Sequence, residues 1–432
     1  MAEPTNARAA AATLILGVTE SGVPISDQIT RGVLAGLVPQ EKARAQRLAL
    51  MSLRNLGRAD AVLKPFLRKP PPPFVRAILR LAVVEMLADA AAPHGVVNAA
   101  VDLVRAGGAK SAGFAGMANA VLRRAAETPA EKWASLPPEI LPGWLRGRLM
   151  SAWGKATVQA MEAAHAAGAP LDLTPKDGDA AGLAARLGGA GLPTGSVRLP
   201  NAGQVSELAG YDDGDWWVQD AGAALAARVL AVQPGERVLD LCAAPGGKTL
   251  QLASTGADVT ALDLSEARMV RLRENLARCR VAAKTIVADA LDWLPDQPFD
   301  AILLDAPCSA TGTIRRHPDL PHCRDAAGLK ALVALQSVLI DRALAWLRPG
   351  GRLLYCTCSL LPEEGERQIS AALARHQDIA VDAETLGQPG IDEHWITAEG
   401  NLRLRPDYWP ETGGMDGFFI ACLRQGGQTG GQ

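Results

Sequence analysis

The chain has 432 residues, which at roughly 100–200 residues per domain is enough for two or three domains. Hydrophobic residues make up 48% of it and charged residues 21%, a composition that excludes wholesale disorder. The formal net charge is only −2, but residues 1–140 carry 17 Lys and Arg against 11 Asp and Glu while the remainder carries 27 against 35, so we expect the two parts to have different tasks.

The apolar and cysteine patterns indicate a cytoplasmic protein without a membrane span. No stretch approaches the ~18 uninterrupted apolar residues that a span needs. The apolar run Ala9–Val18 is not followed by a signal-peptide cleavage site, so we interpret it as the start of an amphipathic helix. All seven Cys lie beyond residue 240, and an odd, clustered set favours a reducing compartment over a disulfide framework.

The first part of the chain, residues 5–125, is predicted to be helical throughout. Phe74, Ile78 and Leu81 recur at helical spacing, and Pro70–Pro73 forms a stiff linker that ends one helix before the next begins. Further short helices are expected at Val96–Arg105 and Phe114–Arg124. We therefore expect an all-helical domain over residues 1–140.

The second part, residues 141–217, is expected to form a smaller connecting domain. Trp144, Leu145, Leu149 and Trp153 favour one helix, and Gly and Ala dominate residues 163–195. The pattern does not define a fold for this part.

The third part, residues 218–425, alternates short apolar strands with helical stretches such as Ser265–Arg278 and Leu329–Leu347. This alternation predicts a mostly parallel, doubly wound α/β sheet, which binds ligands at the carboxyl ends of its strands. The expected strands are Arg237–Leu241, Asp258–Leu262, Thr285–Ala288, Asp300–Leu304 and Arg352–Cys356. Their ends carry Asp240, Asp263, Asp289, Asp305 and the pair Cys356 and Cys358.

A glycine-containing loop joins the first of these strands to a helix. It reads Cys242, Ala243, Ala244, Pro245, Gly246, Gly247, Lys248 and Thr249. The ending Gly-Lys-Thr suggests a phosphate-binding ATPase loop, but that motif needs a glycine where Cys242 stands. A dehydrogenase would need the pattern G-x-G-x-x-G, which is absent here.

An adenosine without phosphates suits this edge of the sheet better. Asp263 is placed to accept hydrogen bonds from both ribose hydroxyls, and Asp289 to contact an adenine amino group. S-adenosylmethionine is such a ligand, and its sulfonium cation favours an acidic surrounding. The alternative for each Asp is a helix N-cap, since all of them stand at strand-to-helix turns.

Two cysteine motifs follow neighbouring strands: Asp305 to Thr313, which contains Cys308, and Tyr355 to Ser359, which contains Cys356 and Cys358. A thiolate that adds to carbon 6 of a pyrimidine makes carbon 5 nucleophilic enough to attack a methyl sulfonium, and it can then be expelled. Asp305 is the candidate for assisting this addition at ring N3. The spacing alone does not choose between Cys356 and Cys358 as the nucleophile.

The alternative for these cysteines is simple burial, which we prefer for Cys242, Cys279 and Cys422. A zinc site is a further alternative for the cysteines and histidines of the two motifs and the loop that follows the first. Its candidate ligands are Cys308, His317, His322, Cys323, Cys356 and Cys358. The usual Cys-x-x-Cys knuckle is missing, so we expect no metal.

At these motifs the chain resembles the RNA cytosine-5 methyltransferases, specifically the bacterial 16S rRNA group once called Sun or Fmu. The resemblance spans about residues 218–422, roughly half the chain. It rests on Val218-Gln219-Asp220, Asp240 to Thr249, Asp305 to Thr313 with Arg315 to Asp319, Thr357-Cys358-Ser359, Pro362-Glu363-Glu364 and Asp416 to Phe419.

The resemblance implies a Rossmann-like S-adenosylmethionine methyltransferase domain and roles for individual residues. Cys358 would be the nucleophile, Cys308 would assist product release, and Asp305 would lie at the base. The cofactor and base site would be lined by Cys242, Ala243, Ala244, Pro245, Gly246, Gly247, Lys248, Asp263, Asp289 and Asp305. The sequence departs from the family at 171–177, where an Arg-x-Asn run usually stands.

The first part resembles the antitermination factor NusB, through Phe74–Met86 and Asn98 to Arg124. This would make residues 1–140 an RNA-docking domain, consistent with their basic charge; the alternative is an ordinary helix bundle with solvated Arg and Lys. Arg315, Arg316 and Lys248 could hold backbone phosphates, with an exposed charged loop as the alternative.

We therefore expect methylation of carbon 5 of a cytosine in rRNA, with S-adenosylmethionine as methyl donor. The target base must leave its stack, so a single-stranded or loop cytosine is favoured. The alternatives are a methyltransferase of the same fold acting on protein or another RNA, and a non-catalytic RNA-binding protein of NusB type. The latter leaves Cys308, Cys358 and the glycine loop unexplained.

Overall fold

The computed structural model describes residues 6–200 and 203–426, and these fall into two compact units. Unit 1 contains the residues up to Gly168 together with Ile314–Asp325. Unit 2 contains Ala169–Thr313 and the residues from Ala326 onward. The segment that directly follows the first cysteine motif therefore belongs to unit 1, although the chain on both sides of it belongs to unit 2.

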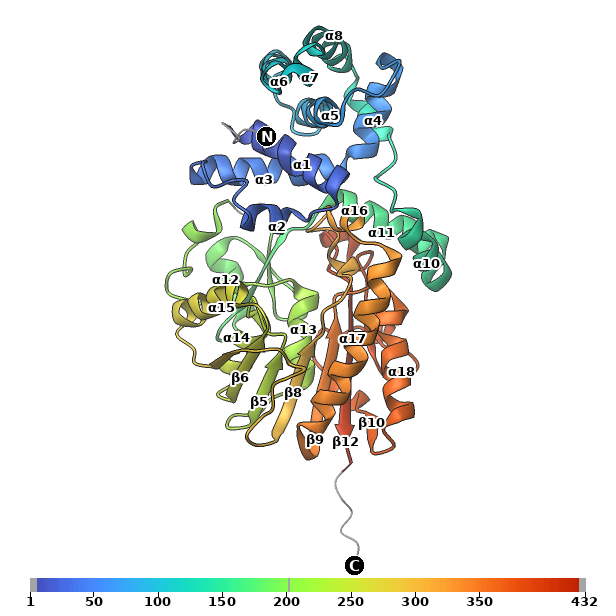
Figure 1. Ribbon diagram of the computed structural model, residues 1–432. Helices are drawn as coiled ribbons and strands as arrows, with labels where there is room; N and C mark the ends of the chain where they lie inside the picture. Colours follow the sequence, from blue (N-terminus) through green and yellow to red (C-terminus); the bar gives the residue numbers. More distant parts are fainter. Residues whose placement is uncertain (1–5, 201–202, 427–432) are drawn as a thin grey trace, which may run out of the picture. The chain divides into compact units, whose positions relative to one another are not determined.

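Unit 1 is helical, as the sequence predicts for its first part (Figure 1). Proline stands at the first position of both α5 and α6, where its missing N–H costs nothing. The helices are α1 (Ala7–Ser21), α2 (Ile25–Thr30), α3 (Pro39–Arg54), α4 (Leu56–Leu63), α5 (Pro73–Leu87), α6 (Pro93–Ala106), α7 (Ala109–Ala112), α8 (Ala115–Ala125), α9 (Ala130–Ser135), α10 (Gly143–Trp153), α11 (Lys155–Ala167) and α16 (Leu320–Cys323).

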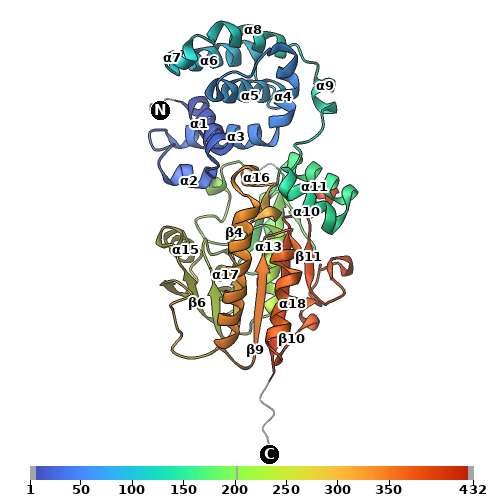
Figure 2. The ribbon, with the colours of Figure 1, turned by 45° about the vertical axis from the view of Figure 1, so that its right-hand side comes forward.

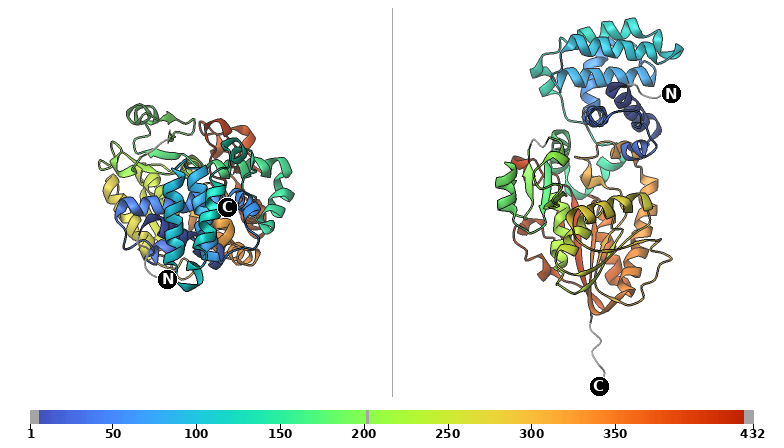
Figure 3. Two further views of the ribbon diagram at one scale, coloured as in Figure 1. Left: turned by 90° about the horizontal axis from the view of Figure 1, so that it is seen from above. Right: turned by 90° about the vertical axis from the view of Figure 1, so that its left-hand side faces the viewer.

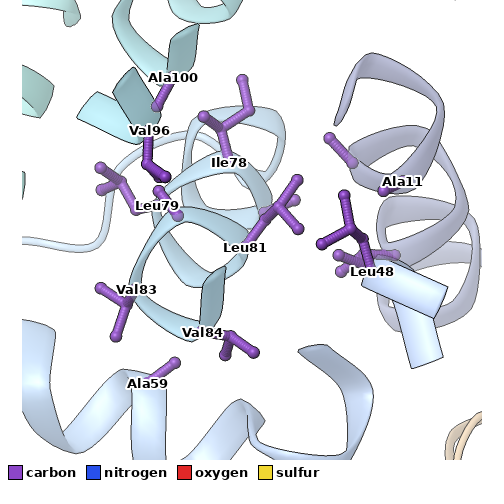
Figure 4. Packing of buried hydrophobic residues seen from close by; sticks show 14 of the residues in the cluster. Ala11, Leu48, Ala59, Ile78, Leu79, Leu81, Val83, Val84, Val96 and Ala100 are labelled. Carbon is purple, nitrogen blue, oxygen red and sulfur yellow. The ribbon is translucent and has the colours of Figure 1, made fainter. Parts of the chain in front are cut away.

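Helix α5 is the centre of this unit. Its buried side chains point to several sides, which is typical of a helix enclosed by others. Figure 4 shows α5 between its neighbours, with Ile78, Leu79, Leu81, Val83 and Val84 of α5 near Ala11 of α1, Leu48 of α3, Ala59 of α4, and Val96 and Ala100 of α6. Burial of this apolar surface is the main force that holds unit 1 together.

The main sheet of unit 2 has the strand order β10-β12-β9-β8-β5-β6-β7. Neighbours from β9 to β7 are parallel, whereas β12 runs antiparallel to β9, and β10 and β11 pair antiparallel with β12. The strands are β5 (Arg237–Leu241), β6 (Asp258–Asp263), β7 (Lys284–Val287), β8 (Phe299–Asp305), β9 (Leu347–Thr357), β10 (Ile379–Val381), β11 (Leu402–Leu404) and β12 (Phe418–Gln425).

Helices cover both faces of this sheet (Figures 1 and 2). Along β5, Val238 packs with the side chains of α13, whereas Leu239 packs with those of α17 on the opposite face. The right-hand view of Figure 3 shows green segments on one side of the sheet and the orange α17 on the other. The helices are α13 (Ala221–Leu230), α14 (Gly247–Ser254), α15 (Glu266–Cys279), α17 (Ala326–Ala345) and α18 (Glu366–Arg375). The expected doubly wound, mostly parallel fold is confirmed.

The antiparallel edge of the sheet was not predicted. Strand β9 is also longer than expected, because it begins at Leu347, which the sequence pattern places in the preceding helix. Short 3-10 turns complete the chain: η1 (Lys64–Phe66), η2 (Val205–Glu207), η3 (Thr311–Thr313), η4 (Pro362–Glu364), η5 (Ala383–Leu386), η6 (Glu393–Trp395) and η7 (Pro410–Thr412).

A second sheet divides the expected connecting segment 141–217. Its four antiparallel strands follow the order β2-β3-β1-β4 and belong to unit 2, whereas α10 and α11 belong to unit 1. The elements are β1 (Leu171–Pro175), α12 (Ala180–Leu187), β2 (Ala190–Gly191), β3 (Val197–Leu199) and β4 (Trp216–Val218). Within the described residues, no helix has both the length and the apolar character to cross a membrane.

Candidate active site

The loop after β5 has a conformation that its glycine makes possible. Gly246 has φ +104°, and a Cβ there would lie 2.8 Å from the side chain of Leu272. The loop is fixed against the end of β6, because Ala243 N–H donates to Leu262 O at 3.1 Å and Ala244 N–H donates to Asp263 Oδ2 at 3.0 Å. The peptide between Ala244 and Pro245 is cis.

The two carboxylates predicted to contact adenosine stand at the end of β6 and just beyond β7. Asp263 is buried and also accepts from Ser265 N–H at 2.9 Å, and Arg268 lies 3.4 Å from its Oδ2. Ser265 rather than Asp263 caps α15. Asp289 is half-buried, and its Oδ1 accepts from Leu291 N–H at 2.8 Å.

Asp305, at the end of β8, pairs with Lys248 at the start of α14. Lys248 Nζ lies 2.8 Å from Asp305 Oδ2 and 5.3 Å from the ring of Phe418. Burial lowers the pKa of Lys248, but the charge and hydrogen bond of Asp305 together with the charges of Cys356 and Cys358 outweigh it, and the pKa is raised overall. Lys248 therefore stays charged beside Asp305, and it is turned toward that carboxylate in the protein interior rather than toward solvent.

Cys308 and Cys358 are brought together from the two neighbouring strands β8 and β9. Their Sγ atoms lie 3.4 Å apart, and both side chains are partly exposed. The backbone holds this arrangement: Ala306 N–H donates to Cys356 O at 3.0 Å and Gly312 N–H donates to Cys358 O at 2.9 Å. The two thiols are therefore within hydrogen-bond reach of each other.

Cys356 and Cys358 have different surroundings, although only one residue separates them. Cys356 is completely buried, with its Sγ 3.6 Å from Asp305 Oδ1. Burial and then the Asp305 charge raise the pKa of Cys356 well above its usual value. Cys358 is partly exposed beside Cys308, so it is the more accessible thiol of this strand.

The remaining candidate residues lie apart from this pair. Cys279 and Cys422 are buried, as preferred from the sequence, and Cys242 is partly buried in the glycine loop. Arg315 is completely buried in unit 1, so its guanidinium is not at the surface where a phosphate would bind. In the described part of the chain, no three or more His, Cys, Asp or Glu side chains are grouped as metal ligands would be.

Sequence patterns did not reveal Arg268, nor the contacts between the side chains of the site. Arg268 lies against the carboxylate of Asp263 and donates to Ala244 O. In the sequence, nothing distinguishes it from the other charged residues of α15. Thr249 donates to the buried Asp240 at 2.5 Å. Lys248 and Asp305 belong to two motifs that the sequence analysis treated separately. Their opposite charges at the same edge of the sheet were the signal that could have predicted this ion pair.

A doubly wound sheet with a glycine loop after its first strand and acidic residues at the following strand ends defines a Rossmann-like methyltransferase domain. The family model described as 16S rRNA methyltransferase RsmB/F matches residues 227–424, and the NusB family model matches residues 5–127. Ribosomal RNA small subunit methyltransferase B of Xanthomonas campestris is 36% identical over 435 residues, covering 96% of each chain. That of Salmonella arizonae is 35% identical, covering 98% of this chain and 99% of the relative. The chain therefore belongs to the RsmB/F family of 16S rRNA methyltransferases.

Solved structures agree with this fold. The crystal structure of the protein PH0851 matches 96% of this chain and 98% of its own length, with a TM-score of 0.73 and 23% identity. A methyltransferase homologue from Pyrococcus horikoshii matches 65% of this chain and 94% of its own, with a TM-score of 0.54 and 29% identity. The first likeness concerns the fold alone.

Proposed function

We propose that this rRNA methyltransferase transfers a methyl group from S-adenosylmethionine to carbon 5 of a cytosine in 16S rRNA, through a covalent bond between Cys358 and the base. The observation that carries the proposal is the 3.4 Å distance between the Sγ atoms of Cys308 and Cys358. A methyltransferase acting on an oxygen or nitrogen atom needs no such pair, because those atoms are nucleophiles already.

The residues beyond β6 and β7 suit an adenosine. Asp289 Oδ2 has no hydrogen-bond partner among the described residues, so it can accept from an amino group. Two large apolar side chains are exposed on the same segments. Leu264 directly follows Asp263 and Leu294 follows Asp289 in the chain, and each is 69% exposed to solvent. An adenine ring would cover apolar surface of this kind while its amino group bonds to the carboxylate. These features support Asp289 as a binding residue.

In the proposed reaction, S-adenosylmethionine supplies an electrophilic methyl group on a sulfonium. The Cys358 thiolate adds to carbon 6 of the cytosine. Asp305, held beside Lys248, acts in this step in its acid form: it donates its proton to ring N3, which is an acceptor, and so takes up the negative charge that the addition places on the ring. Carbon 5 then bonds to the methyl carbon while the bond from that carbon to the sulfonium sulfur breaks, and the donor leaves as a neutral thioether. A base removes the proton from carbon 5, the bond between Cys358 and carbon 6 breaks, and Cys308 assists this release.

Unit 1 would supply the docking surface for RNA. Its residues 5–127 match the NusB family, and residues 1–140 carry the excess of Lys and Arg. Phosphate contacts made by such a surface give affinity without sequence specificity. The choice of base would then depend on unit 2, which carries both cysteines. The target cytosine must be unstacked to reach them, so we propose a loop or single-stranded position.

The proposal is tested with 16S rRNA, S-adenosylmethionine labelled in its methyl group, and nucleoside analysis by mass spectrometry. The native protein should convert one cytidine to 5-methylcytidine, and Cys358→Ala should bind the methyl donor but form no product. Label recovered on an oxygen or nitrogen atom, or on protein, would refute the proposal. The same would follow if Cys358→Ala turned over normally.

A further inference from the structure

Glu364 connects the two cysteine loops in the interior of unit 2. It lies in η4 and is completely buried. Its Oε1 accepts from the N–H of Ser309 at 2.9 Å and from Gln336 Nε2 at 3.0 Å. Its Oε2 accepts from the hydroxyls of Ser309 at 2.5 Å and Ser359 at 2.6 Å.

The serines that Glu364 holds are the immediate neighbours of the two cysteines. Ser309 follows Cys308 and Ser359 follows Cys358, so a single carboxylate holds the backbone N–H and the hydroxyl of Ser309 and the hydroxyl of Ser359. The backbone of Glu364 is itself fixed to β9, because Tyr355 Oη donates to its carbonyl at 2.8 Å and Thr357 Oγ1 at 3.1 Å. Glu364 is therefore bonded to both cysteine loops and to β9.

A buried carboxylate is costly unless it is satisfied by hydrogen bonds. All partners of Glu364 in the described part of the chain are neutral donors, so its charge is not cancelled by a cation. The pKa of Cys308 is raised well above its usual value, by the hydrogen bond with Cys358, by burial, by the Cys358 charge and then by the Glu364 charge.

We propose that Glu364 is a positioning residue that holds the two cysteine loops at their working distance and directs the nucleophilic role to Cys358. The inference rests on the proposed function and deepens it. Gln336 connects Glu364 to the first cysteine loop a second time, because its Nε2, which bonds to Glu364, also donates to the carbonyl of Pro307 at 2.8 Å. Pro307 directly precedes Cys308. Glu364, the last residue of the Pro-Glu-Glu motif, thus receives a role that the sequence does not reveal.

The test is the alkylation of the full-length protein by iodoacetamide, without RNA, in native and Glu364→Gln forms. Glutamine keeps the shape and one carbonyl oxygen, and the serine hydroxyls can rotate to accept from its NH₂ group, so the fold should survive. Mass spectrometry quantifies labelling at Cys308 and Cys358; fragment spectra separate Cys358 from Cys356, which share the tryptic peptide 353–367.

In the native protein Cys358 should be labelled faster than Cys308. In Glu364→Gln the ratio of Cys308 to Cys358 labelling should rise about tenfold near neutral pH, the change that one unit of relative pKa produces. The kcat for methylation should fall while the KM for RNA stays the same. A residue that only supports the fold would lower both thiol reactivities together or alter RNA binding.

The matched control is Glu363→Gln, which changes the adjacent carboxylate, 3.6 Å from Arg367 on α18, and should leave the labelling ratio unchanged. If Glu364→Gln does not fold, Ser309→Ala and Ser359→Ala each remove one contact of the same carboxylate, and each should shift the ratio. A folded Glu364→Gln protein with the native ratio and native kcat would overturn the inference. Because the labelling needs no RNA, failure of the proposed function shows separately, as normal methylation by Cys358→Ala.

Discussion

The Sγ atoms of Cys308 and Cys358 lie 3.4 Å apart, although 50 residues separate them in the chain. They meet because β8 and β9 are parallel neighbours and pair Asp305 with Cys356 in register. The carboxyl ends of both strands therefore open at the same edge of the sheet. The pairing of β8 with β9 therefore brings the thiols of two separate sequence motifs into contact.

Cys308→Ala should allow Cys358 to add to the base but should slow the release of the base from Cys358. If Cys308 assists the expulsion of Cys358, its loss leaves the base attached to the protein, and the adduct accumulates. A band of protein bound to RNA should persist on a denaturing gel, with multiple turnover strongly reduced. Fast turnover without such a band would assign Cys308 another role.

Asp305→Asn should reduce kcat by about 10²–10⁴-fold, the usual contribution of a positioned acid or base. The amide cannot donate a proton to N3, and Lys248 loses its partner at 2.8 Å. Steady-state kinetics with 16S rRNA measure the change. Cys356→Ser is the control, because this buried thiol has no proposed part in bond formation; a loss of kcat as large as that of Asp305→Asn would contradict our distinction between Cys356 and Cys358.

Asp172→Ala should destabilise unit 2 by about 3–5 kcal/mol, the cost of breaking a buried ion pair. Asp172 accepts two hydrogen bonds of 2.7 Å from Arg198, and the two side chains are 0% and 4% exposed. Denaturant unfolding followed by tryptophan fluorescence measures the change. Arg186→Ala breaks the exposed pair with Asp215 and should cost at most about 1 kcal/mol. Equal effects of the two variants would show that burial of the Asp172 pair has no bearing on stability.

The raised pKa of Asp240 should make the free energy of unfolding depend on pH. Burial raises its pKa to about 7, although the hydrogen bond from Thr249 opposes the shift. Between about pH 4 and 7 the folded protein then keeps a proton that the unfolded chain has lost. The stabilisation that comes from this bound proton is therefore complete below about pH 4 and is lost as the pH rises through 7. Over that range the free energy of unfolding should fall by up to about 1.4 kcal/mol per pH unit.

Asp240→Asn should remove this slope, because an amide does not titrate. The measurement is the free energy of unfolding of both proteins from about pH 4 to 8. The native protein should lose stability relative to the variant as the pH increases. Parallel curves for the two proteins would mean that Asp240 titrates alike in the folded and unfolded chain.

The sequence predicted those features that depend on local patterns. The strand Arg237–Leu241 was predicted with its observed ends, and the helices of unit 1 follow from apolar spacing and proline positions. Strand β12 was missed, because an apolar run such as Phe418–Gln425 does not encode which strand it pairs with or in which direction.

The same limit applies to the site. Strand ends could be placed at one edge from the alternation of strands and helices, which is why Cys308 and Cys358 were recognised. Contacts between side chains of different motifs, such as Lys248 with Asp305 or Glu364 with Ser309, depend on packing and left no periodic signal. The division of residues 141–217 between two units likewise results from long-range contacts.

A trapped adduct is the sharpest test of the bond between Cys358 and the base. A 16S rRNA fragment carrying 5-fluorocytidine at the target position, incubated with the native protein and S-adenosylmethionine, should stop after methyl transfer, since the fluorine on carbon 5 is not removed as a proton would be. After nuclease and trypsin digestion, mass spectrometry should find the methylated nucleotide attached to Cys358. Attachment to Cys308 or Cys356, or no covalent product at all, would refute the role of Cys358 as the nucleophile.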